Sequence, residues 1–162
     1  MSNNNKTSTT MAKWFETKAR YERVKDDGTT GKVTEVFMVD ALSFAEAEAR
    51  TLEEVAPFTS GELEVVAAKI TNIKEVVAGY KDEQFTGDKW YTCKLEFITL
   101  DEKTGKEKRT AYNMLILAED IDAAKKNLTK AMEGSMQDYD VKSITESKVM
   151  DVYNYKPATT QE

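Results

Sequence analysis

Three charged residues in the second half of the chain have the types and the order found in some magnesium-dependent nuclease sites. Asp140 is followed by Glu146 and Lys148 on a segment that we expect to form a strand. Such sites work by placing two carboxylates on a metal ion beside a lysine. The spacing is short, however, and the matching segment of the first half, Asn72-Ile73-Lys74, lacks the acid. We therefore interpret these residues as a solvated strand face and predict no catalytic residue and no metal site.

Other familiar chemistry lacks its residues. The chain has no histidine, which removes the serine, cysteine and metal mechanisms that depend on imidazole. The one cysteine, Cys93, falls on the apolar side of a predicted strand and is interpreted as a core residue. The turn around Gly28 resembles a fragment of a calcium loop but lacks its alternate oxygen ligands and closing glutamate. We predict no cofactor.

Aromatic and basic residues share one face of two predicted strands. Rings interleaved with cations on an open sheet can stack bases and neutralise the phosphates of a single-stranded nucleic acid without reading its sequence. Lysines on the third strand of each half extend the set. The candidate binding residues are Trp14, Lys18, Arg20, Trp90, Lys94, Lys74 and Lys148.

Two other interpretations of this face remain open. Trp14 and Trp90 can instead be buried beneath the neighbouring half, since tryptophan usually contributes burial. The same aromatics and the strand edges can also form a homodimer or bind a protein partner, because tryptophan and arginine are favoured contact residues. The net charge of −6 and the pI near 4.9 oppose nucleic-acid binding, and glutamates among the lysines favour a protein.

These candidate residues lie in a sequence that repeats itself. Lys13-Trp14-Phe15 returns as Lys89-Trp90-Tyr91, 76 residues later. Further matches keep the same order along the chain, which makes coincidence a poor explanation. They pair Thr30-Gly31-Lys32 with Thr104-Gly105-Lys106, Ala47 and Leu52 with Ala123 and Leu128, and Ile70-Thr71 and Lys74 with Ile144-Thr145 and Lys148.

Each half is predicted to form two strands, a helix and a third strand. Residues 13–25 alternate between apolar and polar positions, which is the pattern of a half-buried strand, and Asp- and Gly-containing turns follow both first strands. Second strands are expected at 32–41 and 106–117 and third strands at 62–77 and 139–153. Ser43 with Glu46 forms a capping box, and Pro57 ends that helix. The predicted fold class is α+β, with antiparallel sheets and one helix per copy.

Composition favours one folded domain. Hydrophobic residues make up 40% of the 162 residues, charged residues 32%, and only two are proline. We predict one domain over 12–157, made of repeats 12–77 and 88–153, with disordered tails at 1–11 and 158–162. No apolar run is long enough for a membrane span and a single cysteine suits a reducing compartment, so we expect a cytoplasmic protein without membrane contact.

The chain also resembles a known group of proteins. The segments Lys13–Tyr21, Lys69–Lys74 and Val149–Tyr153 are similar to an uncharacterised domain family of Bacteroidetes and their phages, including crAss-like phages. The likeness covers residues 12–157 and brings no catalytic or binding residues with it. It implies a phage or mobile-element setting. From the residues and this setting we expect a non-enzymatic protein that binds single-stranded nucleic acid in replication or recombination. The alternative is an accessory or inhibitor that binds a host or phage protein.

Overall fold

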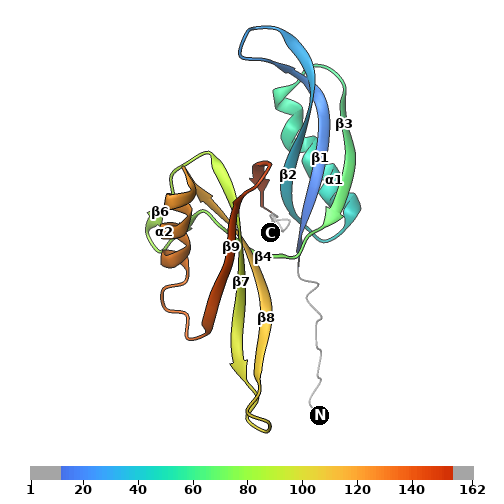
Figure 1. The fold of residues 1–162 in the computed structure, drawn as a ribbon. Coiled ribbons are helices and arrows are strands. Elements are labelled where there is room, and N and C mark those ends of the chain that lie inside the picture. Colours follow the sequence, from blue (N-terminus) through green and yellow to red (C-terminus); the bar gives the residue numbers. More distant parts are fainter. Residues whose placement is uncertain (1–11, 155–162) are drawn as a thin grey trace, which may run out of the picture. The chain divides into compact units, whose positions relative to one another are not determined.

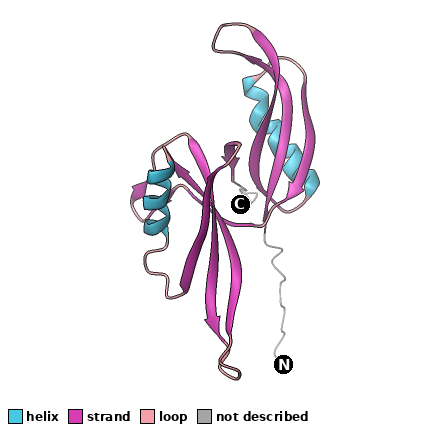
Figure 2. Cartoon of the chain, in the orientation of Figure 1, coloured by secondary structure: helices cyan, strands magenta, loops and turns pink. Residues whose placement is uncertain are grey.

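The computed structural model describes residues 12–154, and within them it shows the predicted α+β class (Figures 1 and 2). The tails predicted at 1–11 and 158–162 lie outside the described residues. The described chain forms two four-stranded sheets, each with one helix, and a short two-stranded hairpin. The helices formed by these residues lack the length and hydrophobicity of a membrane span.

The first repeat begins with a long hairpin. Strand β1 (Lys13–Val24) pairs antiparallel with β2 (Thr30–Ala41), and Gly28 in their turn has the left-handed φ of 83° that glycine adopts without strain. Helix α1 (Phe44–Val55) starts where the Ser43 side chain accepts the Glu46 N–H, as the sequence predicted. A short 3₁₀ turn, η1 (Ala56–Phe58), follows it, and β3 (Leu63–Ile70) then pairs with β1.

The second repeat uses the same order of elements. Strand β7 (Lys89–Leu100) pairs with β8 (Glu107–Ala118) and with β9 (Asp138–Glu146). Helix α2 (Ile121–Ala131) begins at Asp120, whose side chain accepts the Ala123 N–H. A carboxylate at this position also suits the positive end of the helix dipole. The expected strand–strand–helix–strand unit is therefore present twice.

The expected third strands are each two strands. The stretch predicted as 62–77 is divided into β3 and β4 (Ile73–Val77), and the stretch predicted as 139–153 into β9 and β10 (Val149–Tyr153). The second strand of each pair joins the sheet of the other repeat, which gives the orders β10-β2-β1-β3 and β4-β8-β7-β9. β4 runs parallel to β8. The second sheet is thus mixed, which corrects the antiparallel sheets predicted from the sequence.

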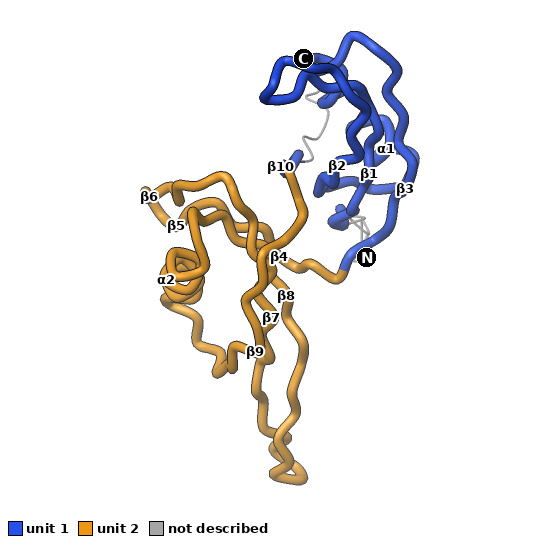
Figure 3. The backbone as a smooth tube through the Cα atoms, turned by 45° about the horizontal axis from the view of Figure 1, so that its top comes forward, with its two compact units in different colours: residues 1–71, 151–162 blue, residues 72–150 orange. Residues whose placement is uncertain are grey.

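This exchange of strands defines two compact units. Unit 1 comprises residues 1–71 and 151–162, and unit 2 comprises residues 72–150 (Figure 3). In unit 1 the core side chains of β1 and β2 pack with those of α1, including Phe15, Phe37 and Val55. In unit 2 the core includes Leu95, Ile116 and Leu128. Each fully buried side chain of this size contributes about 1.5–3 kcal/mol, and each unit has such a cluster.

Strand pairing fixes how the two repeats correspond. Thr71 N–H donates to the Trp14 carbonyl, and Ser147 N–H donates to the Trp90 carbonyl in the same way. The register shifts between Lys18 and Ala19 on β1 and at the equivalent place on β7. The third strands are therefore related by the same 76-residue offset as the first strands, so the predicted match of Ile70 with Ile144 was two residues out.

Two other predicted matches are also shifted. Thr30 begins β2, whereas Thr104 lies in the turn before Glu107, which is the first residue of β8. The helix caps place buried Ala47 opposite buried Ala124 rather than Ala123. The duplication itself is consistent with both sheets.

The segment 78–88, which joins the two predicted repeats, contains a small element of its own. Strands β5 (Gly79–Tyr80) and β6 (Glu83–Gln84) form a hairpin in unit 2, and Phe85 after it is buried in the core. The segment therefore packs as part of unit 2.

Candidate functional site

The candidate residues of unit 1 lie on β1, on the face turned away from the core. Phe15, Thr17 and Ala19 are buried on the core side, so the alternating positions are outward. Lys18 and Arg20 are exposed on this outward face, as the sequence predicted. Trp14 is half-buried, and it is followed on the same face by Glu16.

The charges around these cations are mixed. Glu16 forms an ion pair with Lys69 of β3, with 3.6 Å between the charged atoms. Arg20 stands between Thr34 of β2 and Glu64 of β3 in the strand register. The face therefore presents alternating signs of charge, which weakens its attraction for a polyanion.

Unit 2 arranges the corresponding residues differently. Trp90 is only 8% exposed, so its ring is not available to stack on a base in this structure. Lys94 is exposed between Asn113 and Ser143 in the register. The two tryptophans thus differ in exposure, although the sequence places them at equivalent positions.

An ion-pair cluster occupies the same outward face of unit 2. Arg109 donates to Asp140 at 2.7 Å and to Glu96 at 3.2 Å, and Glu107 lies 3.5 Å from its guanidinium. Hydrogen bonds to Asp140 and then Glu96 raise the pKa of Arg109 above its ordinary value. Three carboxylates share this one guanidinium, so the cluster is acidic rather than basic.

Lys74 and Lys148 do not occupy equivalent positions. Lys74 is exposed on β4, whereas Lys148 lies in the two-residue link between β9 and β10. In the 76-residue correspondence the partner of Lys148 is Asn72. Lys148 lines a shallow surface cavity of unit 2 together with Asp88, Lys89 and Glu146. The structure therefore does not bring the two lysines into one repeated pattern.

The nuclease-like residues do not converge. Asp140 is held by Arg109, and it precedes Glu146 by six positions on β9. Strand geometry separates positions six residues apart by roughly 20 Å. Among residues 12–154 no group of three or more histidine, cysteine or acidic residues is placed to hold a metal ion. This geometry offers no site for two carboxylates on one metal.

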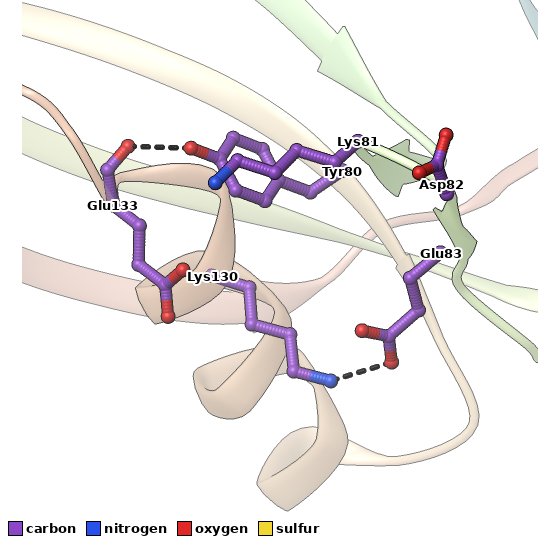
Figure 4. Close-up of a pocket in the computed structure, with 6 residues that line it drawn as sticks. All are labelled: Tyr80, Lys81, Asp82, Glu83, Lys130 and Glu133. Atoms are coloured by element: carbon purple, nitrogen blue, oxygen red, sulfur yellow. Dashed lines mark hydrogen bonds and ion pairs between the residues drawn. The ribbon is translucent and has the colours of Figure 1, made fainter.

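The hairpin β5–β6 forms a second surface cavity against α2 that sequence reasoning missed. Lys130 donates to Glu83 at 2.6 Å, and the Tyr80 hydroxyl donates to the Glu133 carbonyl at 2.8 Å (Figure 4). Lys81 at the tip has a left-handed φ of 54° and lies over the Tyr80 ring. Because Lys130 and Glu83 neutralise each other, we interpret these contacts as attaching the hairpin to the helix.

The strongest candidate surface is the open edge of unit 1, which sequence reasoning also missed. β3 is last in the order of its sheet, so no described strand pairs with its outer side. Its residues Val66 to Ile70 are all exposed. Large apolar side chains of unit 1 are exposed: Ile70 on this edge is 47% exposed, and Phe44 on α1 and Phe58 after it are 51% and 71% exposed. Phe44 packs edge-on against Phe15, the register partner of Ile70.

The two sheet edges built by the third strands differ in charge. The eight residues of β3, LEVVAAKI, include two charged residues, whereas the nine of β9, DYDVKSITE, include four. Charged side chains along an edge strand discourage pairing with another chain, and their scarcity permits it. The sequence signal for this site was therefore the low charge of one third strand compared with its repeat.

The comparisons with known proteins place the chain in a family. Residues 13–155 match the family described as "Domain of unknown function (DUF4494)", so the chain belongs to it. No curated protein and no solved structure matches the chain. The family description assigns no activity, so a function has to be argued from the surfaces described above.

Proposed function

We propose that this member of the DUF4494 family is a non-enzymatic protein that binds a protein partner through the open edge of β3. The observation that carries the proposal is an apolar, sparsely charged edge strand whose residue Ile70 pairs with Phe15, against which the exposed ring of Phe44 packs. A partner segment in extended conformation can add a strand to such an edge, with main-chain hydrogen bonds supplying affinity and flanking pockets supplying specificity.

The main chain of β3 is oriented for strand addition. Thr71 N–H donates to the Trp14 carbonyl, so in the antiparallel ladder the main-chain groups of Lys69 and Ala67 point toward β1. Those of Ile70 and Ala68 consequently point to the open side. The bulge at the register shift adds one residue, after which the main-chain groups of Val65 and Leu63 point to the open side. Four residues thus offer their main-chain groups to a partner.

A peptide selection tests this proposal. Random peptides would be displayed and selected on the wild-type protein, and the recovered peptides would be measured by anisotropy against the variant Ala68→Pro. Proline removes an outward N–H, which an edge strand tolerates, without touching the bonds to β1. We expect binding to weaken at least about tenfold, because roughly one main-chain hydrogen bond and its register are lost.

The control is Glu146→Pro on the other edge. Glu146 corresponds to Ile70. Because the Ser147 N–H points toward β7 and donates to the Trp90 carbonyl, the N–H of the preceding Glu146 points to the open side of β9. This variant should bind the peptides as the wild type does. Equal binding to wild type and Ala68→Pro would place the peptide site elsewhere and end the proposal.

A second proposal is single-stranded nucleic-acid binding, and exposed Lys18 and Arg20 beside half-buried Trp14 favour it. The 8% exposure of Trp90 and the net charge of −6 oppose it. Anisotropy of a labelled mixed-sequence DNA strand, at low and at physiological salt, decides this. Salt-sensitive binding that Lys18→Ala and Arg20→Ala weaken would support it, and no binding at low salt would eliminate it.

The biological setting remains part of the proposal. The resemblance to proteins of Bacteroidetes and their phages implies a phage or mobile-element protein. In that setting a binder of this kind would act on a host or phage protein, for example as an inhibitor. A strand-adding binder needs no cofactor or catalytic group, which agrees with the chain's lack of histidine.

A further inference from the structure

We propose that one occupant of the β3 edge is β3 of a second copy of this chain, paired antiparallel about a twofold axis between Val66 and Ala67. This inference rests on the proposed function, because it names a partner for the same edge. It would join two unit 1 sheets into one continuous sheet of eight strands. The strand itself supplies three arguments for this pairing.

The first argument is the main chain. In an antiparallel pair, residues that exchange hydrogen bonds stand directly opposite each other. The residues of β3 whose main-chain groups point to the open side are Leu63, Val65, Ala68 and Ile70, as the Thr71–Trp14 hydrogen bond and the bulge require. Only one antiparallel offset opposes all four, and it pairs Leu63 with Ile70 and Val65 with Ala68. The bulge then sits at the twofold axis, on the side facing β1.

The second argument is charge. The same offset places Glu64 opposite Lys69 of the second copy, and by symmetry Lys69 opposite its Glu64. Both residues are on the outward face, because their register partners on β1 are Arg20 and Glu16. Opposite charges directly across a strand pair are stabilising. The only two charged residues of the strand thus become each other's partners.

The third argument is the apolar surface. Leu63 and Ile70 lie on the helix side of the sheet, since their register partners are the core residues Tyr21 and Phe15. The offset brings these two apolar side chains opposite each other at both ends of the new pair. Ile70, 47% exposed in one copy, would lose much of its contact with water.

The repeated edge gives an internal comparison. The equivalent offset on β9 would oppose Asp140 with Thr145 and Tyr139 with Glu146. Neither pair is complementary, because Asp140 would face an uncharged threonine and Glu146 a tyrosine. The self-complementary pattern therefore belongs to β3 and does not follow from the duplicated fold alone.

A charge-swap experiment tests the register. Sedimentation velocity would be measured on the full chain up to about 0.5 mM, a range that detects weak association. We expect a wild-type dimer, with Glu64→Lys and Lys69→Glu each weakening it about ten- to a hundredfold, because each change creates two like-charged pairs by symmetry. Glu102→Lys and Lys103→Glu, exposed in the β7–β8 turn, alter net charge equally and should leave the dimer unchanged.

Mixing the two variants gives the decisive result. A mixed dimer of Glu64→Lys with Lys69→Glu restores opposite charges in both pairs, so the mixture should associate although neither variant does alone. The double variant E64K/K69E should also dimerise, which excludes loss of folding as the cause of the single effects. Circular dichroism of each variant checks the fold directly.

The outcomes separate this inference from the proposed function. A wild-type chain that stays monomeric, or a dimer insensitive to the single substitutions, overturns the β3–β3 pairing. Peptide binding that is lost in Ala68→Pro, measured below the dimerisation concentration, would still support strand addition by another protein. Failure of that peptide test with a charge-dependent dimer would leave the second copy as the occupant and refute a separate partner.

Discussion

Replacing Trp90 by alanine should destabilise the folded protein in the absence of any ligand. Trp90 is 8% exposed, and its carbonyl accepts the N–H of Ser147, the residue that follows β9. Removing a buried tryptophan side chain costs about 3–5 kcal/mol, from lost burial and from the cavity that remains. In a chain of this size each kcal/mol lowers the melting temperature by about 2–4 °C, so the expected loss is about 6–20 °C.

Urea unfolding followed by far-ultraviolet circular dichroism measures this loss without relying on tryptophan fluorescence. The midpoint should fall, and the slope should stay near that of the wild type if the unfolding remains two-state. Trp14→Ala, at the equivalent but half-buried position, should cost less. Lys94→Ala is the matched control on the same strand face, and because Lys94 is exposed its effect should stay within about 0.5 kcal/mol.

The stability of Trp90→Ala decides how the nucleic-acid proposal can be tested. If Trp90→Ala unfolds easily, any loss of DNA binding in that variant reports folding, and only Lys18 and Arg20 can test the nucleic-acid proposal cleanly. An unchanged urea midpoint would refute the burial argument. If such a stable variant also lost DNA binding, a stacking role for Trp90 would replace it.

Three further predictions concern single groups. Thr51→Val should lower the free energy of unfolding, measured in urea, by about 1–3 kcal/mol. Thr51 donates to the Ala47 carbonyl, so it accepts from the buried Thr17 hydroxyl at 2.8 Å, and the substitution leaves that hydroxyl without an acceptor. The double variant with valine at both positions should recover much of the lost stability. If Thr17→Val proves the costlier single change, the assigned donor direction is wrong. The Cys93 thiol is fully buried, with its pKa raised to about 11 by burial, so disulfide reagents at pH 8 should label it only as fast as the protein opens; labelling at the rate of a free thiol would contradict this. Burial and the hydrogen bond to Glu75 raise the pKa of Tyr112 from 10.0 to about 12, so the native state holds this proton more tightly and stability should fall as pH rises from 10 to 12; Tyr112→Phe should flatten that part of a pH series of melting temperatures, and an unchanged slope would count against the shift.

Local pattern was sufficient for much of the fold. Alternation along β1 and β7, the Ser43 cap and the glycines at 28 and 105 are properties of neighbouring residues, and both glycines have left-handed φ values. Which sheet a strand joins is a long-range property. β4 and β10 follow their preceding strands after only two residues, and nothing in their alternation distinguishes staying in one sheet from crossing to the other.

The sequence contained a signal that decides between the exposed and the buried interpretation of Trp90. Alternation places Trp90 on the face away from α2, and the interpretations of that face as a binding surface and as a buried surface were both left open. The partner strands carry continuous apolar runs, Val36–Val39 and Met114–Leu117. Such runs are typical of strands buried on both faces. Met38 and Leu115, outward in the register, are accordingly 3% and 1% exposed.

The open edge shows what a duplicated fold leaves to its individual side chains. In both repeats the third strand lies at the edge of its sheet and has a bulge at the same position, so the backbone exposes two similar edges. Across the equivalent offset on β9, Asp140 would face Thr145 and Lys142 would face Ser143, so these charges meet no opposite charge and oppose pairing with another chain. On β3, Glu64 and Lys69 are placed so that a second β3 would complement them. Because the backbones correspond residue by residue, association through β3 but not β9 would have to come from these side chains, and moving the charges of β9 onto β3 should abolish it.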